Sequence, residues 1–118
     1  MTEHIFRVGD RDDFQIAAST GYYNGEAFDI SDGFIHTSTR DQLAGTLHRH
    51  YADMNQVCLA IAEIDPGRLN ARLNWEVSYN GERFPHIYGS LNWDAVTQVH
   101  IVHRNKIGFW SLDEIILP

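Results

Sequence analysis

The sequence predicts a small α+β domain with a strongly bent β-sheet, mixed or antiparallel, and about two helices. Residues 75–86 hold two strand-like runs around Asn80-Gly81, a dipeptide favoured in tight hairpin turns. Residues 43–51 place apolar side chains every four positions, which is the spacing of a buried helix face. Residues 56–64 are almost continuously apolar and have the length of a buried strand. Together these segments indicate a domain that mixes strands and helices.

The N-terminal part predicts one strand and one short helix. Residues 5–8 form a strand pattern that ends at Gly9. Asp10 is suited to cap the helix that follows, because its carboxylate can accept hydrogen bonds from free backbone N–H groups. That helix is expected to stop by Gly21. Residues 20–32 mix turn-forming and aromatic residues and are predicted to form an ordered but irregular loop.

Residues 33–37 predict a short strand that runs directly into the main helix. Thr39 and Gln42 have the spacing of a capping box, in which two side chains bind backbone N–H groups reciprocally. The helix is predicted to end at residues 53–55, and the strand at residues 56–64 follows.

The hairpin prediction fixes which residues face one another. A two-residue loop at Asn80-Gly81 pairs Tyr79 with Glu82, Val77 with Phe84 and Trp75 with His86. Because Pro85 has no backbone N–H to donate, its strand is expected at a sheet edge or with a bulge at that point. A turn at residues 92–95 and a strand at residues 96–103 complete the prediction.

Length and composition limit the function classes. The 118 residues show no linker or repeat and predict one domain, residues 1–118. A formal net charge of −7 argues against general nucleic-acid binding, which relies on neutralising phosphates. The chain has no membrane-spanning apolar run, no secretory signal pattern and a single cysteine, Cys58. We therefore expect a cytoplasmic protein, without a membrane partner, that is a monomer or a weak homodimer.

His36 is the first candidate for chemistry, because it lies in an apolar strand-like run and histidine changes charge near neutral pH. On a strand, Phe34, His36 and Ser38 share one face. An imidazole beside a hydroxyl, just before a helix N-terminus, suits a sugar hydroxyl or a phosphate. The alternative is a core histidine next to a serine that caps the helix.

His86 is the second candidate, and Glu76 is the carboxylate most suited to act with it. In the predicted register His86 faces Trp75, so that the imidazole can lie against the indole. The same register places Glu76 and His86 on opposite faces of the hairpin, and a bulge near Pro85 would be needed to bring them together. The alternative is that His86 only packs in an aromatic cluster.

Other residues add weaker signals. Tyr22 and Tyr23 are candidates for stacking on a base or a nicotinamide ring, and the alternative is that they cover the core. The histidines lack the short spacings that are typical of metal sites, so the sequence predicts no metal ligands.

Three motifs together resemble a known family. They are Asp-Gly-Phe-Ile-His-x-Ser at residues 32–38, Trp-Glu-x-Ser at residues 75–78 and Phe-Pro-His-Ile-Tyr-Gly at residues 84–89. Their combination resembles DUF952, a family of mainly bacterial proteins of unknown function. That family is grouped with the ADP-ribosyltransferase-like fold, so the resemblance implies a split sheet with an NAD-binding cleft between its halves.

The resemblance also implies roles for individual residues. In transferases of that superfamily the histidine of a His-x-Ser or His-x-Thr element contacts the ribose of the nicotinamide half. The matching element here is His36-Thr37-Ser38. Tyr88 and Glu76 are the candidates for the tyrosine that stacks on nicotinamide and for the catalytic glutamate.

Three hypotheses remain open at this stage. The first is an NAD-dependent transfer enzyme, with NAD as a substrate and no other cofactor. The second is a non-catalytic module that binds a small nucleotide-like ligand in the same cleft. The third is a metal-free acid–base enzyme that uses His36 and His86 as a pair, which requires both rings to reach one bound atom.

Overall fold

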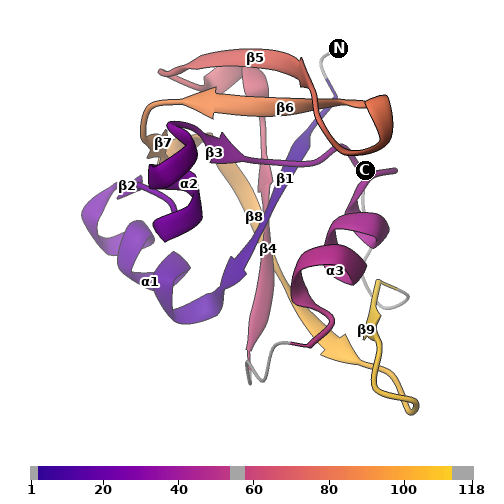
Figure 1. The fold of residues 1–118 in the computed structure, drawn as a ribbon. Coiled ribbons are helices and arrows are strands. Elements are labelled where there is room, and N and C mark those ends of the chain that lie inside the picture. Colours follow the sequence, from indigo (N-terminus) through magenta and orange to yellow (C-terminus); the bar gives the residue numbers. More distant parts are fainter. Residues whose placement is uncertain (1–2, 54–57, 113–118) are drawn as a thin grey trace.

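The structure is a computed structural model that describes residues 3–53 and 58–112 (Figure 1). Within these residues it contains three α-helices, namely α1 (Arg11–Thr20), α2 (Ala27–Asp32) and α3 (Leu43–Tyr51). The longer strands are β1 (Ile5–Asp10), β4 (Leu59–Ile64), β5 (Arg72–Val77), β6 (Arg83–Tyr88) and β8 (Val96–Arg104). The short strands are β2 (Tyr22–Tyr23), β3 (Ile35–His36), β7 (Leu91–Asn92) and β9 (Trp110–Ser111). Single 3₁₀ turns are η1 (Pro66–Arg68), η2 (Tyr79–Gly81) and η3 (Trp93–Ala95).

The strands curl into separate sheets, and every pairing among the described residues is antiparallel. The sheet orders are β1-β4-β8-β9, β3-β6-β5 and β2-β7. A bridge between Phe6 and Ser38 joins the first two sheets. In Figure 1 the β3-β6-β5 sheet crosses one end of the β1-β4-β8 strands. The predicted α+β domain with a strongly bent sheet is confirmed, and its strands are antiparallel.

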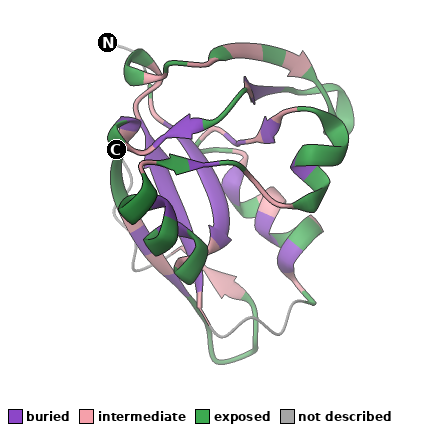
Figure 2. Cartoon of the chain, turned by 90° about the vertical axis from the view of Figure 1, so that its left-hand side faces the viewer, coloured by how far each residue is buried: buried purple, intermediate pink, exposed green. Residues whose placement is uncertain are grey.

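Strands β1 and β4 of the four-stranded sheet are buried on both faces, and buried strands are purple in Figure 2. Neighbouring residues of a strand point to opposite faces. Ala62 of β4 therefore belongs to one buried cluster with Phe14 of α1, while Ile61 belongs to another with Leu47 of α3. The predicted helix stripe is confirmed, since α3 buries Leu43, Leu47 and Tyr51.

The predicted helix boundaries are largely confirmed. The Asp10 carboxylate accepts hydrogen bonds from the backbone N–H groups of Asp12 and Asp13, at 2.7 and 3.3 Å. Gly21 ends α1 in a left-handed conformation with φ of 97°. Thr39 and Gln42 bind each other reciprocally, at 3.0 and 3.3 Å, in the turn before α3.

The prediction of an irregular loop over residues 20–32 is wrong, and with it the expected number of helices. This segment contains β2 and a third helix, α2. The side chain of Asp29 accepts a hydrogen bond from the backbone N–H of Glu26 at the start of α2, at 2.6 Å. Asp29 is also buried against Arg7 of β1, which is distant in sequence. The contact that holds α2 in place is therefore tertiary, and the local pattern could not indicate it.

The predicted pairing of the hairpin is wrong by one residue. Asn80 and Gly81 do adopt left-handed φ values, 57° and 76°. The turn, however, takes in one more residue, because the backbone N–H of Ser78 donates to the Glu82 carbonyl at 2.8 Å. The observed pairs are Val77 with Arg83, Glu76 with Phe84, Trp75 with Pro85 and Asn74 with His86.

The position of β6 also differs from the prediction. It is the central strand of its sheet and not an edge, and no bulge occurs at Pro85. The ladder to β3 covers only Ile87 and His86. Pro85 lies just beyond that ladder, so its missing N–H interrupts no pairing with β3.

Some predictions fall outside the described residues. Residues 54–57, where the main helix was expected to end and the next strand to begin, belong to this group, as do residues 113–118 of the apolar tail. Within the described part of the chain, none of the helices has the length and apolar character needed to cross a membrane.

Candidate functional site

His36 and His86 lie side by side on one face of the β3-β6-β5 sheet. They are a directly opposed cross-strand pair, and their ring centroids are 5.7 Å apart. The one-residue change of register also brings Glu76 to this face, since it pairs with Phe84, two residues before His86. The predicted separation of Glu76 from His86 is therefore corrected, and the irregularity that joins them is at the turn rather than at Pro85.

Each imidazole is bound through Nδ1 to a carboxylate. For His36 this carboxylate is Asp29, at 2.8 Å, and for His86 it is Glu76, at 2.8 Å. The two residues differ in exposure, because His86 is only 5% exposed while about a third of the His36 side chain is accessible. The sheet face thus carries two carboxylate–histidine pairs next to each other.

Asp29 is held by a buried network. Its two carboxylate oxygens accept a bidentate pair of hydrogen bonds from Arg7, at 2.6 and 2.7 Å, and one oxygen also accepts from the backbone N–H of His36. Burial alone would raise the pKa of Asp29, but the hydrogen bonds from His36 and Arg7 hold it well below its usual range. Asp29 is therefore an ionised acceptor at neutral pH, and Nδ1 of His36 is the donor.

Arg7 is 2% exposed and positions several parts of the site at once. Burial by itself would lower its pKa, but the hydrogen bond to Asp29 and the nearby acidic groups together outweigh this effect, and the pKa is raised. The guanidinium also donates to Glu26, at 3.0 Å, and to the backbone carbonyl of His36, at 3.1 Å. One buried cation therefore ties β1, α2 and β3 together.

The second ring nitrogen of His36 has a different partner. Nε2 lies 2.9 Å from Oδ2 of Asp32, whose side chain is 54% exposed at the end of α2. A ring that donates to both Asp29 and Asp32 is a positively charged imidazolium.

Glu76 and Tyr88 complete the surroundings of His86. Oε1 of Glu76 accepts hydrogen bonds from Nδ1 of His86 and, at 2.6 Å, from the Tyr88 hydroxyl. The hydrogen bond from Tyr88 and then that from His86 lower the pKa of Glu76. The ring of Phe34 stacks on that of His86, with centroids 3.9 Å apart, and fixes its plane.

A pocket of about 360 Å³ opens beside both histidines. Its walls come from β1, α2, β3, α3 and the β5–β6 hairpin. Besides the two histidines, the polar residues that line it are Arg7, Asp32, Thr37, Thr46, Arg49, His50, Tyr51, Ser78 and Tyr79. The volume lies in the range of natural small-molecule sites.

The sequence-predicted residues divide into two groups. His36, His86 and Thr37 line the pocket, and the Thr37 hydroxyl donates to the Pro85 carbonyl at 2.6 Å. Glu76 and Tyr88 support His86 without lining the pocket.

The remaining candidates lie elsewhere. Ser38 is buried and hydrogen-bonded to Thr46, at 2.8 Å. Tyr22 is exposed in β2, while Tyr23 packs against Phe14 in the core. Trp75 is on the opposite face of β5 from Glu76, away from His86, because the register differs from the predicted one.

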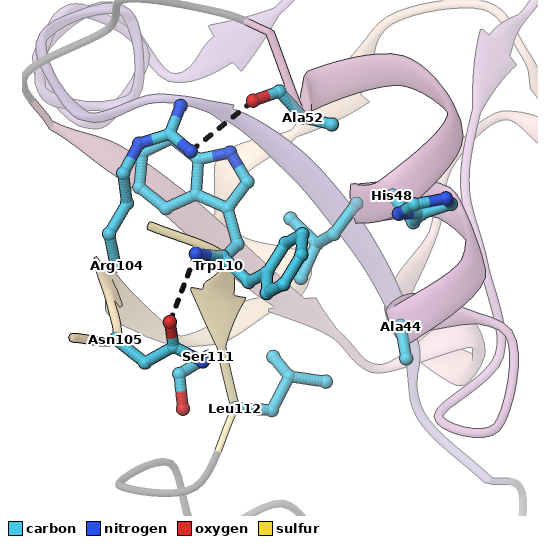
Figure 3. Close-up of a pocket in the computed structure, with 10 residues that line it drawn as sticks. Ala44, His48, Ala52, Arg104, Asn105, Trp110, Ser111 and Leu112 are labelled. Atoms are coloured by element: carbon cyan, nitrogen blue, oxygen red, sulfur yellow. Dashed lines mark hydrogen bonds between the residues drawn. The ribbon is translucent and has the colours of Figure 1, made fainter. Parts of the chain in front are cut away.

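A second pocket, of about 320 Å³, lies between α3 and the segment around β9 (Figure 3). Arg104 extends over it, donates to the Ala52 carbonyl at 3.2 Å and stacks on Trp110 at 4.1 Å. Among the described residues that line it there is one histidine, His48, and no carboxylate. This pocket therefore offers no pair of groups that could transfer protons in concert. In the described part of the chain, no three His, Cys, Asp or Glu side chains are arranged to hold a metal ion.

Comparison with known proteins places the chain in a family. Residues 9–99 match the model of the family described as "Protein of unknown function (DUF952)". The chain belongs to the DUF952 family. No curated protein matches it. The resemblance that the three sequence motifs indicated is thus confirmed at the level of the family.

This DUF952 chain is similar to solved structures of protein CC0527 from Caulobacter crescentus. A crystal structure of CC0527 has 29% sequence identity, covers 92% of this chain and 94% of that chain, and gives a TM-score of 0.83. A solution NMR structure of the same protein has 28% identity, covers 96% of each chain and gives a TM-score of 0.80.

Sequence reasoning missed three residues of the DUF952 site, namely Arg7, Asp29 and Arg49. Arg7 had one available signal, since a charged residue stands inside the apolar strand pattern of residues 5–8. Asp29 had none, because its partners come from other elements. Arg49 lines the pocket, and its guanidinium lies over the Tyr79 ring, 3.7 Å from the centroid.

Proposed function

We propose that the pocket beside His36 and His86 binds a small organic ligand, and that the two rings exchange protons with it without a metal. The observation that carries this proposal is the cross-strand placement of two carboxylate-bound imidazoles, 5.7 Å apart, along one pocket. Rings at this separation can both reach one bound group, directly or through a water molecule.

His86 is the general base in this proposal. Glu76 is ionised at neutral pH because its pKa is lowered, so it can only accept the hydrogen bond from Nδ1 of His86. A neutral ring with its proton on Nδ1 has a free lone pair on Nε2. Among the described residues Nε2 of His86 has no hydrogen-bond partner, and the ring lines the pocket.

His36 is the general acid. Its Nδ1 donates to the buried Asp29, and its Nε2 lies at hydrogen-bond distance from the exposed Asp32. Each ring nitrogen thus has a carboxylate oxygen within hydrogen-bond distance. When the Asp32 side chain turns towards water, the proton on Nε2 becomes available to a ligand in the pocket.

Cleavage of a phosphodiester fits this pair of roles. His86 accepts the proton of an attacking hydroxyl, whose oxygen forms a new bond to phosphorus. As the bond from phosphorus to the leaving oxygen breaks, that oxygen takes the proton of His36. The two rings end with exchanged protonation states, and proton exchange with water restores them.

The test is turnover of model phosphodiesters, such as bis(p-nitrophenyl) phosphate and a cyclic nucleotide, in buffer that contains EDTA. We expect His36→Ala and His86→Ala each to lower kcat by about 100-fold or more, in the range that general acid–base groups contribute. His48→Ala, an exposed histidine in the other pocket, is the matched control and should leave kcat unchanged. Turnover that survives both substitutions, or the absence of turnover of every ester, would contradict the proposal.

An NAD-dependent transfer is the second candidate. It is supported by the position of His36 and Thr37, the first two residues of the His-x-Ser element, in the wall of the pocket. It is also the function that the grouping of DUF952 with the ADP-ribosyltransferase-like fold implies. In this candidate His36 holds the ribose, and the acidic Glu76 stabilises the positive charge as nicotinamide leaves.

Release of nicotinamide from NAD distinguishes the two candidates. The transfer enzyme should release nicotinamide, and His36→Ala should abolish the release. Intact NAD after long incubation with acceptors would exclude this candidate. If NAD binds but is not consumed, the protein is the non-catalytic nucleotide-binding module.

A further inference from the structure

We propose that Arg49 is the anion-binding residue of this pocket and that it recognises a phosphate group of the ligand. This inference shares its pocket with the proposed function and adds a substrate class to it. The protein has a formal net charge of −7, and yet Arg49 has no carboxylate partner among the described residues.

The other cation of the pocket wall is already neutralised. Arg7 is paired with Asp29 and with Glu26, both within 3.0 Å. Arg49, in contrast, forms no ion pair among the described residues. The Nε of each of these two arginines is buried without a hydrogen-bond partner, so that Arg49 lacks both a counterion and a partner for this donor. A buried donor without a partner is costly, and a ligand acceptor would satisfy it.

The surroundings of Arg49 orient its donors. Its guanidinium lies over the ring of Tyr79, 3.7 Å from the centroid, and near that of Phe84, at 5.9 Å. The Tyr79 ring covers one face of the guanidinium, so that the N–H groups point outwards from its edge. Such a fixed planar donor set matches the oxygens of a phosphate.

The positive charges of Arg49 and His36 act on a neighbouring side chain of the pocket. His50 also lines the pocket, and its pKa is lowered first by burial and then by the positive charges of Arg49 and His36. Asp32 is the carboxylate in the pocket wall, and it contacts His36. An anion held by Arg49 would therefore lie in the same pocket as the acid–base pair, His36 and His86.

Gly45 lies one helical turn before Arg49 in α3, and because it has no side chain it leaves space for the guanidinium. A Cβ atom at Gly45 would lie 2.7 Å from Nη1 of Arg49, which is too close for a normal contact. Because Gly45 is in a helix with ordinary φ, alanine suits its backbone. Gly45→Ala should therefore displace the guanidinium without changing any charge.

The experiment is calorimetric titration of the full chain with inorganic pyrophosphate, adenosine monophosphate and adenosine. We expect pyrophosphate and adenosine monophosphate to bind and adenosine to bind much more weakly. Arg49→Gln should weaken pyrophosphate binding by about tenfold or more, as expected for a hydrogen bond between charged groups. Gly45→Ala should weaken it in the same direction and remain folded, as thermal unfolding would show. Arg68→Gln removes an exposed arginine outside the pocket and should have no effect.

Equal affinities for Arg49→Gln and wild type, or equal losses in Arg49→Gln and Arg68→Gln, would overturn the inference. The outcome is separable from that of the proposed function. If pyrophosphate binding depends on Arg49 but no ester is cleaved, the anion site stands and the acid–base reaction does not. If esters are cleaved while Arg49→Gln changes neither KM nor pyrophosphate binding, the acid–base reaction stands and the anion site does not.

Discussion

At the scale of single residues, the site depends on carboxylates that fix the imidazoles. Asp29 receives hydrogen bonds from Arg7, from the His36 ring and from the backbone of His36 and Glu26. Asp29 thereby holds a proton on Nδ1 of His36. This orientation directs Nε2 of the same ring towards Asp32. The network has a structural role as well, since without Asp29 the buried Arg7 would keep only Glu26, at 3.0 Å, as a counterion.

Asp29→Asn should lower the free energy of unfolding by about 3 kcal/mol, because it removes the buried carboxylate that binds Arg7 through both oxygens and leaves only the partly exposed Glu26 as its counterion. Urea unfolding would measure the change. Asp32→Asn removes a carboxylate from the same helix at an exposed position and should change stability by less than about 1 kcal/mol. Similar stabilities of the two variants would contradict the role of Asp29.

The effect of Asp29→Asn on stability should depend on pH. The pKa of Asp29 in the folded protein is depressed below its ordinary value of 3.8. A carboxylate whose pKa is lower in the folded than in the unfolded protein stabilises the fold at any pH above its unfolded-state pKa. This stabilisation is lost as the pH falls from the unfolded-state pKa towards the folded-state pKa. The stability of the wild type should therefore fall below about pH 4 more steeply than that of Asp29→Asn. Parallel acid limbs in the two unfolding curves would be inconsistent with this linkage.

Glu76 should control Tyr88 as well as His86. The hydrogen bond to Glu76 raises the pKa of Tyr88 above its ordinary value of 10.0. Glu76→Gln removes the negative charge, so the Tyr88 pKa should fall towards that value. NMR signals of the Tyr88 ring during an alkaline titration would show the shift, and Glu82→Gln in the nearby turn is the charge-matched control. An unchanged Tyr88 titration in Glu76→Gln would show that the contact is absent in solution.

At the scale of elements, the sequence indicated most of the helices and strands but not how they pair. The caps of α1, the buried stripe of α3 and the strand character of β1, β4 and β8 followed from local patterns. The register of the β5–β6 hairpin did not, because the Asn80-Gly81 signal fits turns of different lengths. One extra residue at Ser78 changes the face of Glu76, and this decides whether it can reach His86.

The hairpin turn should be sensitive at Gly81, where φ is 76°. Gly81→Ala should destabilise the protein by about 1–2 kcal/mol, because a Cβ disfavours the left-handed conformation. Glu82→Ala, at the next residue with ordinary φ, should change stability by less than about 0.5 kcal/mol. Equal unfolding free energies for both variants would mean that the turn has a different conformation.

At the scale of the whole molecule, the site is a product of sheet curvature. Arg7, Asp29, His36 and His86 come from four different elements, and three of these lie in the first third of the chain. Motif spacing singled out His36, His86 and Glu76, and the structure brings these three residues to one sheet face. It could not select Asp29 or Arg49, because their importance comes from tertiary contacts between charged and aromatic side chains.

The most direct measurement of the central claim follows the ring C–H signals of all seven histidines by NMR during a pyrophosphate titration. His36, His86 and His50, which line one pocket, should shift together and saturate with one dissociation constant. His4 and His100, which contact Glu63 on another part of the protein, should not move. Saturating shifts of His36 without His86, or uniform small shifts of all seven rings, would contradict a shared site.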